Sequence, residues 1–142
     1  METNKFISSL VLLTALSSPV VASALSIGNS LTIRNHTNHD STSIINDGRC
    51  SVDVLHEGGV TRKHTDKTIP AAALLAACLG HFSDCKADVY MTDNCTGAKV
   101  AVVHFSIYTG IIQPIVTLDP SYIMTGTGFE AQIDGGPDLA VM

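Results

Sequence analysis

Residues 99–108 read KVAVVHFSIY, and this stretch decides the fold class. It is apolar at nearly every position and rich in valine and isoleucine, which favour β-strands. A strand with one face in water alternates apolar and polar residues, whereas a strand that is covered on both faces is apolar throughout. The stretch therefore predicts a central strand of a β-sheet.

Shorter segments on both sides of this stretch alternate apolar and polar residues with a period of two. That period is typical of strands that turn one face toward a core. The predicted strands are residues 31–34, 50–54, 85–91 and 129–134. The segment Ile111–Leu118 is also extended, but Pro114 lacks the N–H that a central strand needs. We therefore expect this segment to be an edge strand or to contain a bulge.

Turn residues separate the predicted strands. Asn46-Asp47-Gly48 is typical of a short hairpin, which here links Ile44-Ile45 to the strand that begins at Cys50. Residues 92–97 form a second polar turn, between the strand 85–91 and the central strand. The chain is therefore expected to fold mainly as antiparallel strands.

One segment, PAAALLAACL at residues 70–79, breaks the period of two. It begins with proline, is rich in alanine and leucine, and is followed by Gly80. Proline in the first turn and glycine past the end are typical of a short helix. The whole pattern predicts a mainly β protein, an antiparallel β-sandwich of about seven or eight strands with one short helix at about 70–79.

The first 24 residues have the pattern of a secretory signal peptide. Lys5 precedes a largely apolar run that ends in Ala22-Ser23-Ala24. Serine, threonine and proline interrupt this run, whereas a transmembrane helix needs roughly 20 consecutive apolar residues. We expect cleavage after Ala24 and a single exported domain over residues 25–142, with a loose tail after about residue 136. The protein is then periplasmic or secreted, with no transmembrane segment in the mature chain.

The charge of the chain argues against nucleic acid as a partner. The formal net charge is -5, and the chain has only 8 lysine and arginine residues. Binding to a phosphate backbone needs clustered cations, and the only local basic group is Arg62, Lys63 and Lys67.

Four cysteines lie in the predicted exported domain, at Cys50, Cys78, Cys85 and Cys95. An even number in a small exported domain predicts two disulfides, and the chain lacks the Cys-x-x-Cys pairs that zinc sites use. Four cysteines allow three pairings, and their spacing does not choose among them. Because Cys50 and Cys85 lie on the inward faces of their predicted strands, we expect Cys50–Cys85 and Cys78–Cys95.

A polar cluster at residues 35–40, with the sequence NHTNHD, is the best candidate for a metal site. Imidazole and carboxylate groups suit zinc or copper, so His36, His39 and Asp40 are the predicted ligands. The alternative is a solvated loop whose asparagine, aspartate and threonine side chains bind local main-chain groups.

Residues 90–97, YMTDNCTG, resemble the folded-hairpin signature of βγ-crystallin domains. The resemblance implies a hairpin and calcium binding. Such domains normally carry a second copy and an Asx-Asx-x-Ser-Ser calcium loop, and neither is intact in this chain. Residues 38–42 only approximate that loop.

Catalytic motifs are missing from the sequence. The chain has no Gly-x-Ser-x-Gly elbow and no His-Glu-x-x-His pair, which leaves enzyme activity undecided but disfavoured. We therefore expect a non-catalytic binding protein that uses the loops at one end of its sheets. Its partner would be a protein, a glycan or a cell-surface component. The alternatives are a metal-binding or metal-dependent protein and a structural or assembly component.

Overall fold

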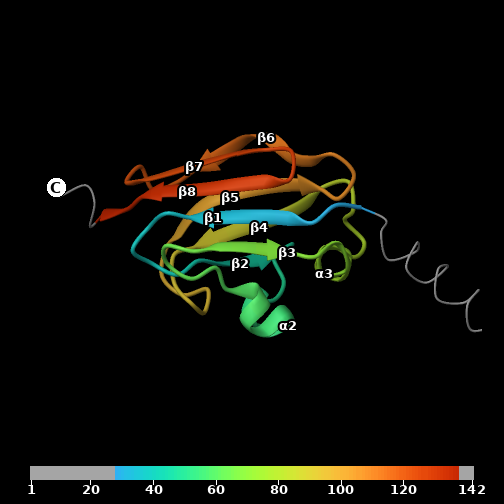
Figure 1. Cartoon of the computed structure of the whole chain (residues 1–142), viewed down its shortest axis with the longest axis horizontal. Coiled ribbons are helices and arrows are strands. Elements are labelled where there is room, and N and C mark those ends of the chain that lie inside the picture. The colour runs from blue at the N-terminus through green and yellow to red at the C-terminus, as the bar shows by residue number, and fades with distance from the viewer. Residues whose placement is uncertain (1–27, 138–142) are drawn as a thin grey trace, which may run out of the picture.

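The computed structural model describes residues 28–137, which form a sandwich of two four-stranded sheets (Figure 1). The strands are β1 (Leu31–Asn35), β2 (Thr42–Ile45), β3 (Asp66–Ile69), β4 (Cys85–Tyr90), β5 (Lys99–Ser106), β6 (Gly110–Thr117), β7 (Tyr122–Thr127) and β8 (Glu130–Gly135). One sheet has the strand order β3-β1-β8-β7, and the other has the order β2-β4-β5-β6. The predicted β-sandwich with two disulfides is confirmed.

Strand β5 lies inside its sheet, between β4 and β6, as its sequence predicts. Ala101, Val103 and Phe105 are buried and alternate with Val102 and His104, which are half-buried. The inward residues pack between the sheets in two apolar clusters. Strand β5 therefore contributes buried side chains to both apolar clusters of the core.

Strand β6 is an edge strand, and its pairing with β5 is irregular around Pro114. Val102 pairs with Val116 and His104 pairs with Ile112, so three residues of β6 lie opposite one residue of β5. Both parts of the prediction from Pro114 are therefore confirmed.

One pair of strands departs from the predicted antiparallel arrangement. Strands β1 and β8, the first and the last of the described strands, run parallel to each other. All the other pairs of neighbouring strands within residues 28–137 are antiparallel. No hairpin joins β1 to β8, so local turn residues do not fix their relative direction.

The predicted strand at residues 50–54 is wrong, because this segment forms the helix α2 (Ser51–Leu55), followed by the 3-10 helix η1 (His56–Gly59). Only Cys50 keeps strand geometry, in an isolated bridge to Ile44. The Ser51 hydroxyl donates to the carbonyl of Gly59 at 2.6 Å, which closes the segment on itself. The turn at residues 46–48 is present, but a helix follows it, and the described fold therefore has two short α-helices.

The helix predicted at about 70–79 is confirmed as α3 (Ala71–Ala77). Pro70 directly precedes it, and Gly80 follows in the left-handed region at φ +82°. Leu74 on this helix is buried in the same apolar cluster as Phe105 and the Cys78 and Cys85 sulfurs.

The predicted signal peptide (1–24) and the loose tail predicted after about residue 136 lie outside the described residues, apart from Gly136 and Pro137. Within residues 28–137, no helix has the length and apolar character to cross a membrane.

Candidate functional site

Three loops gather at the end of the sandwich where β1 and β4 end and where β2 and β5 begin (Figure 1). They are residues 36–41, 60–65 and 91–98, which we call the loop face. Ser41 and Thr61 join the first two loops through reciprocal main-chain hydrogen bonds of 2.9 Å. Cys95 of the third loop donates its main-chain N–H to the Thr42 hydroxyl at the start of β2.

The side chain of Asn35 organises the first loop from the last position of β1. It is 0% exposed, and its amide nitrogen donates to the carbonyls of His39 at 2.8 Å and Thr61 at 3.1 Å. Its amide oxygen accepts the main-chain N–H of Thr37 at 3.0 Å and the Thr37 hydroxyl at 2.7 Å. A buried amide with two donated and two accepted hydrogen bonds leaves the loop little freedom to change conformation.

Ionic hydrogen bonds hold the second loop to the first. The carboxylate of Asp40 accepts the main-chain N–H of Lys63 at 2.9 Å and a guanidinium N–H of Arg62 at 2.9 Å. The Lys63 N–H, and then Arg62, hold the pKa of Asp40 below its usual value. Arg62 also binds both carboxylate oxygens of Glu57, at 2.7 and 2.9 Å. These contacts place the exposed Arg62 side chain between two carboxylates.

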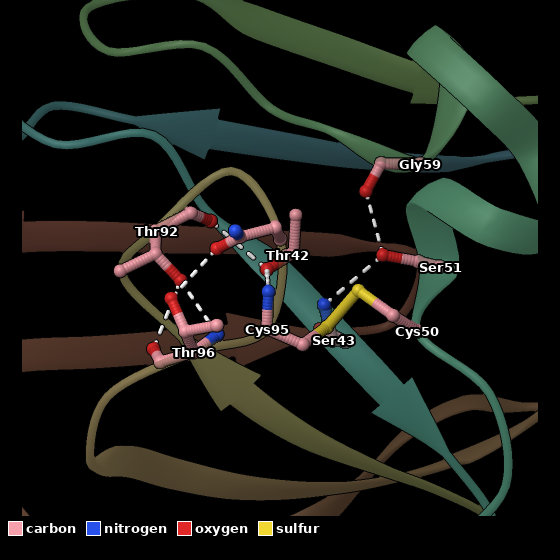
Figure 2. Close-up of a disulfide and its surroundings, with 9 residues drawn as sticks. Thr42, Ser43, Cys50, Ser51, Gly59, Thr92, Cys95 and Thr96 are labelled. Atoms are coloured by element: carbon pink, nitrogen blue, oxygen red, sulfur yellow. Dashed lines mark hydrogen bonds between the residues drawn. A yellow bond between two sulfur atoms is a disulfide. The ribbon is translucent and has the colours of Figure 1, made fainter.

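The disulfide between Cys50 and Cys95 fastens the third loop (Figure 2). Beside it, the Thr42 hydroxyl donates to the carbonyl of Thr92 and accepts the N–H of Cys95, both at 2.9 Å. The Thr92 hydroxyl in turn donates to the carbonyl of Thr96 at 2.9 Å and accepts its N–H at 3.0 Å. The third loop is therefore held by one covalent bond and four hydrogen bonds.

The disulfide pairing differs from the expected one. The expected pairs Cys50–Cys85 and Cys78–Cys95 are wrong, and the observed pairs are Cys50–Cys95 and Cys78–Cys85. Cys50 is buried, but it directly precedes helix α2 and does not begin the predicted strand on which the expected pairing rested. Cys78 directly follows α3 and lies seven positions before Cys85, so the short connection brings it back to the start of β4.

The three predicted metal ligands, His36, His39 and Asp40, each make different contacts in the structure. Nδ1 of His36 lies 3.0 Å from a carboxylate oxygen of Asp134, at the end of β8. The main-chain groups of His39 bind Asn35 and Thr37, and both oxygens of Asp40 accept hydrogen bonds. In the part of the chain that the structure describes, no three His, Cys, Asp or Glu side chains are grouped as a metal site. Binding of zinc, copper or calcium stays a prediction, which a calorimetric titration with each metal would test.

The sequence alternative for residues 35–40, local hydrogen bonds from asparagine, aspartate and threonine, describes this loop better. The polar side chains do bind main-chain groups nearby, but Asn35 and Thr37 are buried at 0% exposure and are not solvated. The role of Arg62 and Lys63 was missed, because they lie more than twenty positions from Asp40.

Two histidines are oriented by carboxylates, as a catalytic base would be. Nδ1 of His104 lies 2.6 Å from Asp84, and Nδ1 of His36 lies 3.0 Å from Asp134. A nucleophile would have to bind the second ring nitrogen, and among residues 28–137 neither histidine has such a hydroxyl partner.

Comparison with known proteins gives one family and one similar fold. A family model described as "T2SS substrate NttC" matches residues 3–136. The crystal structure of the Legionella pneumophila type II secretion system substrate NttC is similar to this chain, with a TM-score of 0.62 and 23% sequence identity. That match covers 75% of this chain and 97% of the other, and at this identity it shows the fold alone. No curated protein matches the chain.

Proposed function

Because the chain belongs to the NttC family of type II secretion system substrates, it is an exported protein, and we propose that it acts as a non-catalytic binding protein through its loop face. Binding through loops on a rigid β-scaffold is a common use of sandwich folds. The proposed partner is a protein, a glycan or a cell-surface component that the protein meets after export.

The observation that carries the proposal is the fixed conformation of the loop face. The buried Asn35 amide, the Asp40–Arg62 contact and the Cys50–Cys95 disulfide each tie one loop to its neighbours. A surface that is ordered before binding loses less conformational entropy when the complex forms. Fixed loops are therefore better suited to recognition than mobile ones of the same composition.

The exposed side chains of the loop face indicate a polar partner. His36, His64 and Asn94 are exposed, and each can donate or accept hydrogen bonds. Arg62 is exposed too, but Asp40 and Glu57 offset its charge. A surface of this kind fits neutral hydrogen-bonding groups, such as those of a glycan or a protein loop, better than a polyanion.

Site-specific photo-cross-linking tests the proposal. A photoreactive amino acid is placed at position 64 or 94 on the loop face, and at position 109 or 127 at the opposite end as matched controls. After incubation of the purified protein with the cells that it meets outside its producer, we expect adducts from the loop-face positions alone. Adducts from the control positions alone, or turnover of ester, peptide or glycoside substrates, would contradict the proposal.

A further inference from the structure

A cavity lies between the two sheets on the side where β2 and β3 form the sheet edges. It has a volume of about 110 Å³, and α2, η1 and α3 contribute to its wall. Its apolar lining includes Leu31, Ile45, Ile69, Leu74 and Phe105, which come from both sheets and from α3. Both sheets and the helices therefore form the cavity, and the loop face contributes only part of its wall.

Hydrogen bonds within the protein engage the Ser51 hydroxyl and several main-chain groups of the lining. The Ser51 hydroxyl donates to the carbonyl of Gly59 at 2.6 Å and accepts the N–H of Ser43 at 3.0 Å (Figure 2). Thr61 exchanges main-chain hydrogen bonds with Ser41. Since these groups are engaged within the protein, the cavity offers an entering molecule mainly apolar contacts.

A second cavity of about 70 Å³ adjoins the first. Their shared lining is Leu31, Ile33, Ser41, Ser43, Ala87 and Phe105. It continues between the sheets as far as Ile133 on β8. Because they share these lining residues, the two cavities lie side by side between the sheets, with mainly apolar walls. For comparison, an engineered apolar cavity of about 150 Å³ stays dry and binds benzene. The two cavities taken together, but neither alone, are as large as that engineered cavity.

The first cavity reaches the surface beside α2. Val54 on α2 is 37% exposed and Gly58 is exposed, although both line the cavity. Deeper lining residues such as Leu74 and Phe105 are buried. Ala77, at the last position of α3, is half-buried and completes this side of the wall. An apolar group can therefore enter between α2 and α3.

We propose that this space binds one alkyl chain, which enters beside Val54 and Ala77 and extends between the sheets toward Ala87. The aliphatic lining and the side-by-side arrangement of the two cavities favour a chain over a planar ring. The chain belongs either to a free fatty acid or to a membrane lipid, and its polar end stays outside. This site borders the loop face, since Ser41 and Thr61 belong to both, but the proposal does not depend on the loop-face function.

Decanoic acid and phosphatidylcholine vesicles are the two probes for the test. Calorimetry measures decanoic acid binding, and co-sedimentation measures vesicle binding. The variant Ala77→Leu narrows the entrance of the first cavity. The variant Ala87→Leu fills space beside the wall that the two cavities share. Ala76→Leu is the matched control, because Ala76 is the exposed neighbour of Ala77 on the same helix.

We expect saturable binding of one decanoic acid, weakened about tenfold in Ala77→Leu and Ala87→Leu, which corresponds to about two excluded methylene groups. The control should bind as the wild type does. If the protein binds vesicles but not decanoic acid, and the two filling variants weaken vesicle binding, the alkyl chain belongs to a membrane lipid. Binding of neither probe, or binding that both filling variants leave unchanged, would overturn the proposal.

A methyl NMR titration of the wild type tests the site without any variant. Decanoic acid should shift the methyl signals of Leu31, Ile45 and Leu74, which line the cavity. The exposed methyl groups of Ile112 and Val116 on β6 should not move. Shifts confined to the exposed methyl groups would place the chain on the surface and overturn the proposal.

Discussion

The disulfide between Cys50 and Cys95 closes a long loop, so its removal should strongly destabilise the fold. The two cysteines are 45 positions apart. The chain-entropy relation for a loop of about 45 residues gives roughly 13 cal/mol/K, which is about 4 kcal/mol at 25 °C. A domain of this size has a total unfolding free energy of about 5–15 kcal/mol. The variant Cys50→Ala/Cys95→Ala should therefore lose about 4 kcal/mol, a large part of that total.

Urea denaturation without reductant, followed by far-UV circular dichroism, measures this loss. Amide hydrogen exchange shows which part of the fold loses stability. The N–H of Cys95 donates to the Thr42 hydroxyl, and the N–H of Thr96 donates to the Thr92 hydroxyl, both beside the disulfide. Exchange at positions 95 and 96 should be faster in this variant than in the wild type. A loss below about 1 kcal/mol, with unchanged exchange at these positions, would refute the reasoning.

Three further predictions follow from buried or strained positions. Asn35→Ala should cost about 3 kcal/mol in urea denaturation, because it leaves several buried hydrogen-bonding groups unpaired, whereas the exposed Asn94→Ala should cost less than about 0.5 kcal/mol. A main-chain N–H and then a guanidinium lower the folded pKa of Asp40, so its stabilising contribution is complete above about pH 4 and is lost as pH falls through the folded pKa. The urea midpoint of the wild type should therefore fall more steeply between about pH 5 and pH 2 than that of Asp40→Asn, and parallel profiles would contradict this. Gly110→Ala should cost more than about 3 kcal/mol, because φ is +92° and the new Cβ would collide with the main chain of Gly128. Gly128→Ala, at φ +56° with open space around the position, should cost only about 1 kcal/mol, and equal losses would disprove the collision.

Local sequence patterns predicted the parts of the fold that local physics controls. The apolar run at 99–108 predicted the internal strand, Pro114 predicted the irregular edge strand, and the alanine-rich segment at 70–79 predicted a helix. Each of these features depends on burial or main-chain chemistry within about ten residues. The period of two failed at residues 50–54, because five residues are too few to separate a strand from a single turn of helix.

Long-range features could not be predicted in the same way. The parallel pairing of β1 with β8 joins segments about one hundred positions apart, and no local turn records it. The disulfide pairing was wrong for a related reason, since it rested on the mistaken strand that begins at Cys50. The cavity needs both sheets and the helices in place, so the sequence carries no separate signal for it.

The sequence indicated residues 35–40 as a candidate site but did not predict the contacts that fix this segment. Residues 36–40 lie on the loop face, Asn35 ends β1, and metal binding by His36, His39 and Asp40 stays a prediction. Asp40 accepts hydrogen bonds from Arg62 and Lys63, and their proximity depends on the bridge between Ser41 and Thr61. Pairing between two segments twenty residues apart therefore decided which groups Asp40 would meet.

The affinity of the cross-linked partner is the most direct test of the proposed binding role. Its Kd is measured for the wild type, for the loop-face variant His64→Ala/Asn94→Ala, and for Tyr108→Ala, whose exposed side chain lies at the opposite end of the sandwich. The account predicts that the loop-face variant weakens binding about tenfold or more, and that Tyr108→Ala leaves the Kd unchanged. An unchanged Kd for the loop-face variant, or an equal loss for Tyr108→Ala, would contradict it.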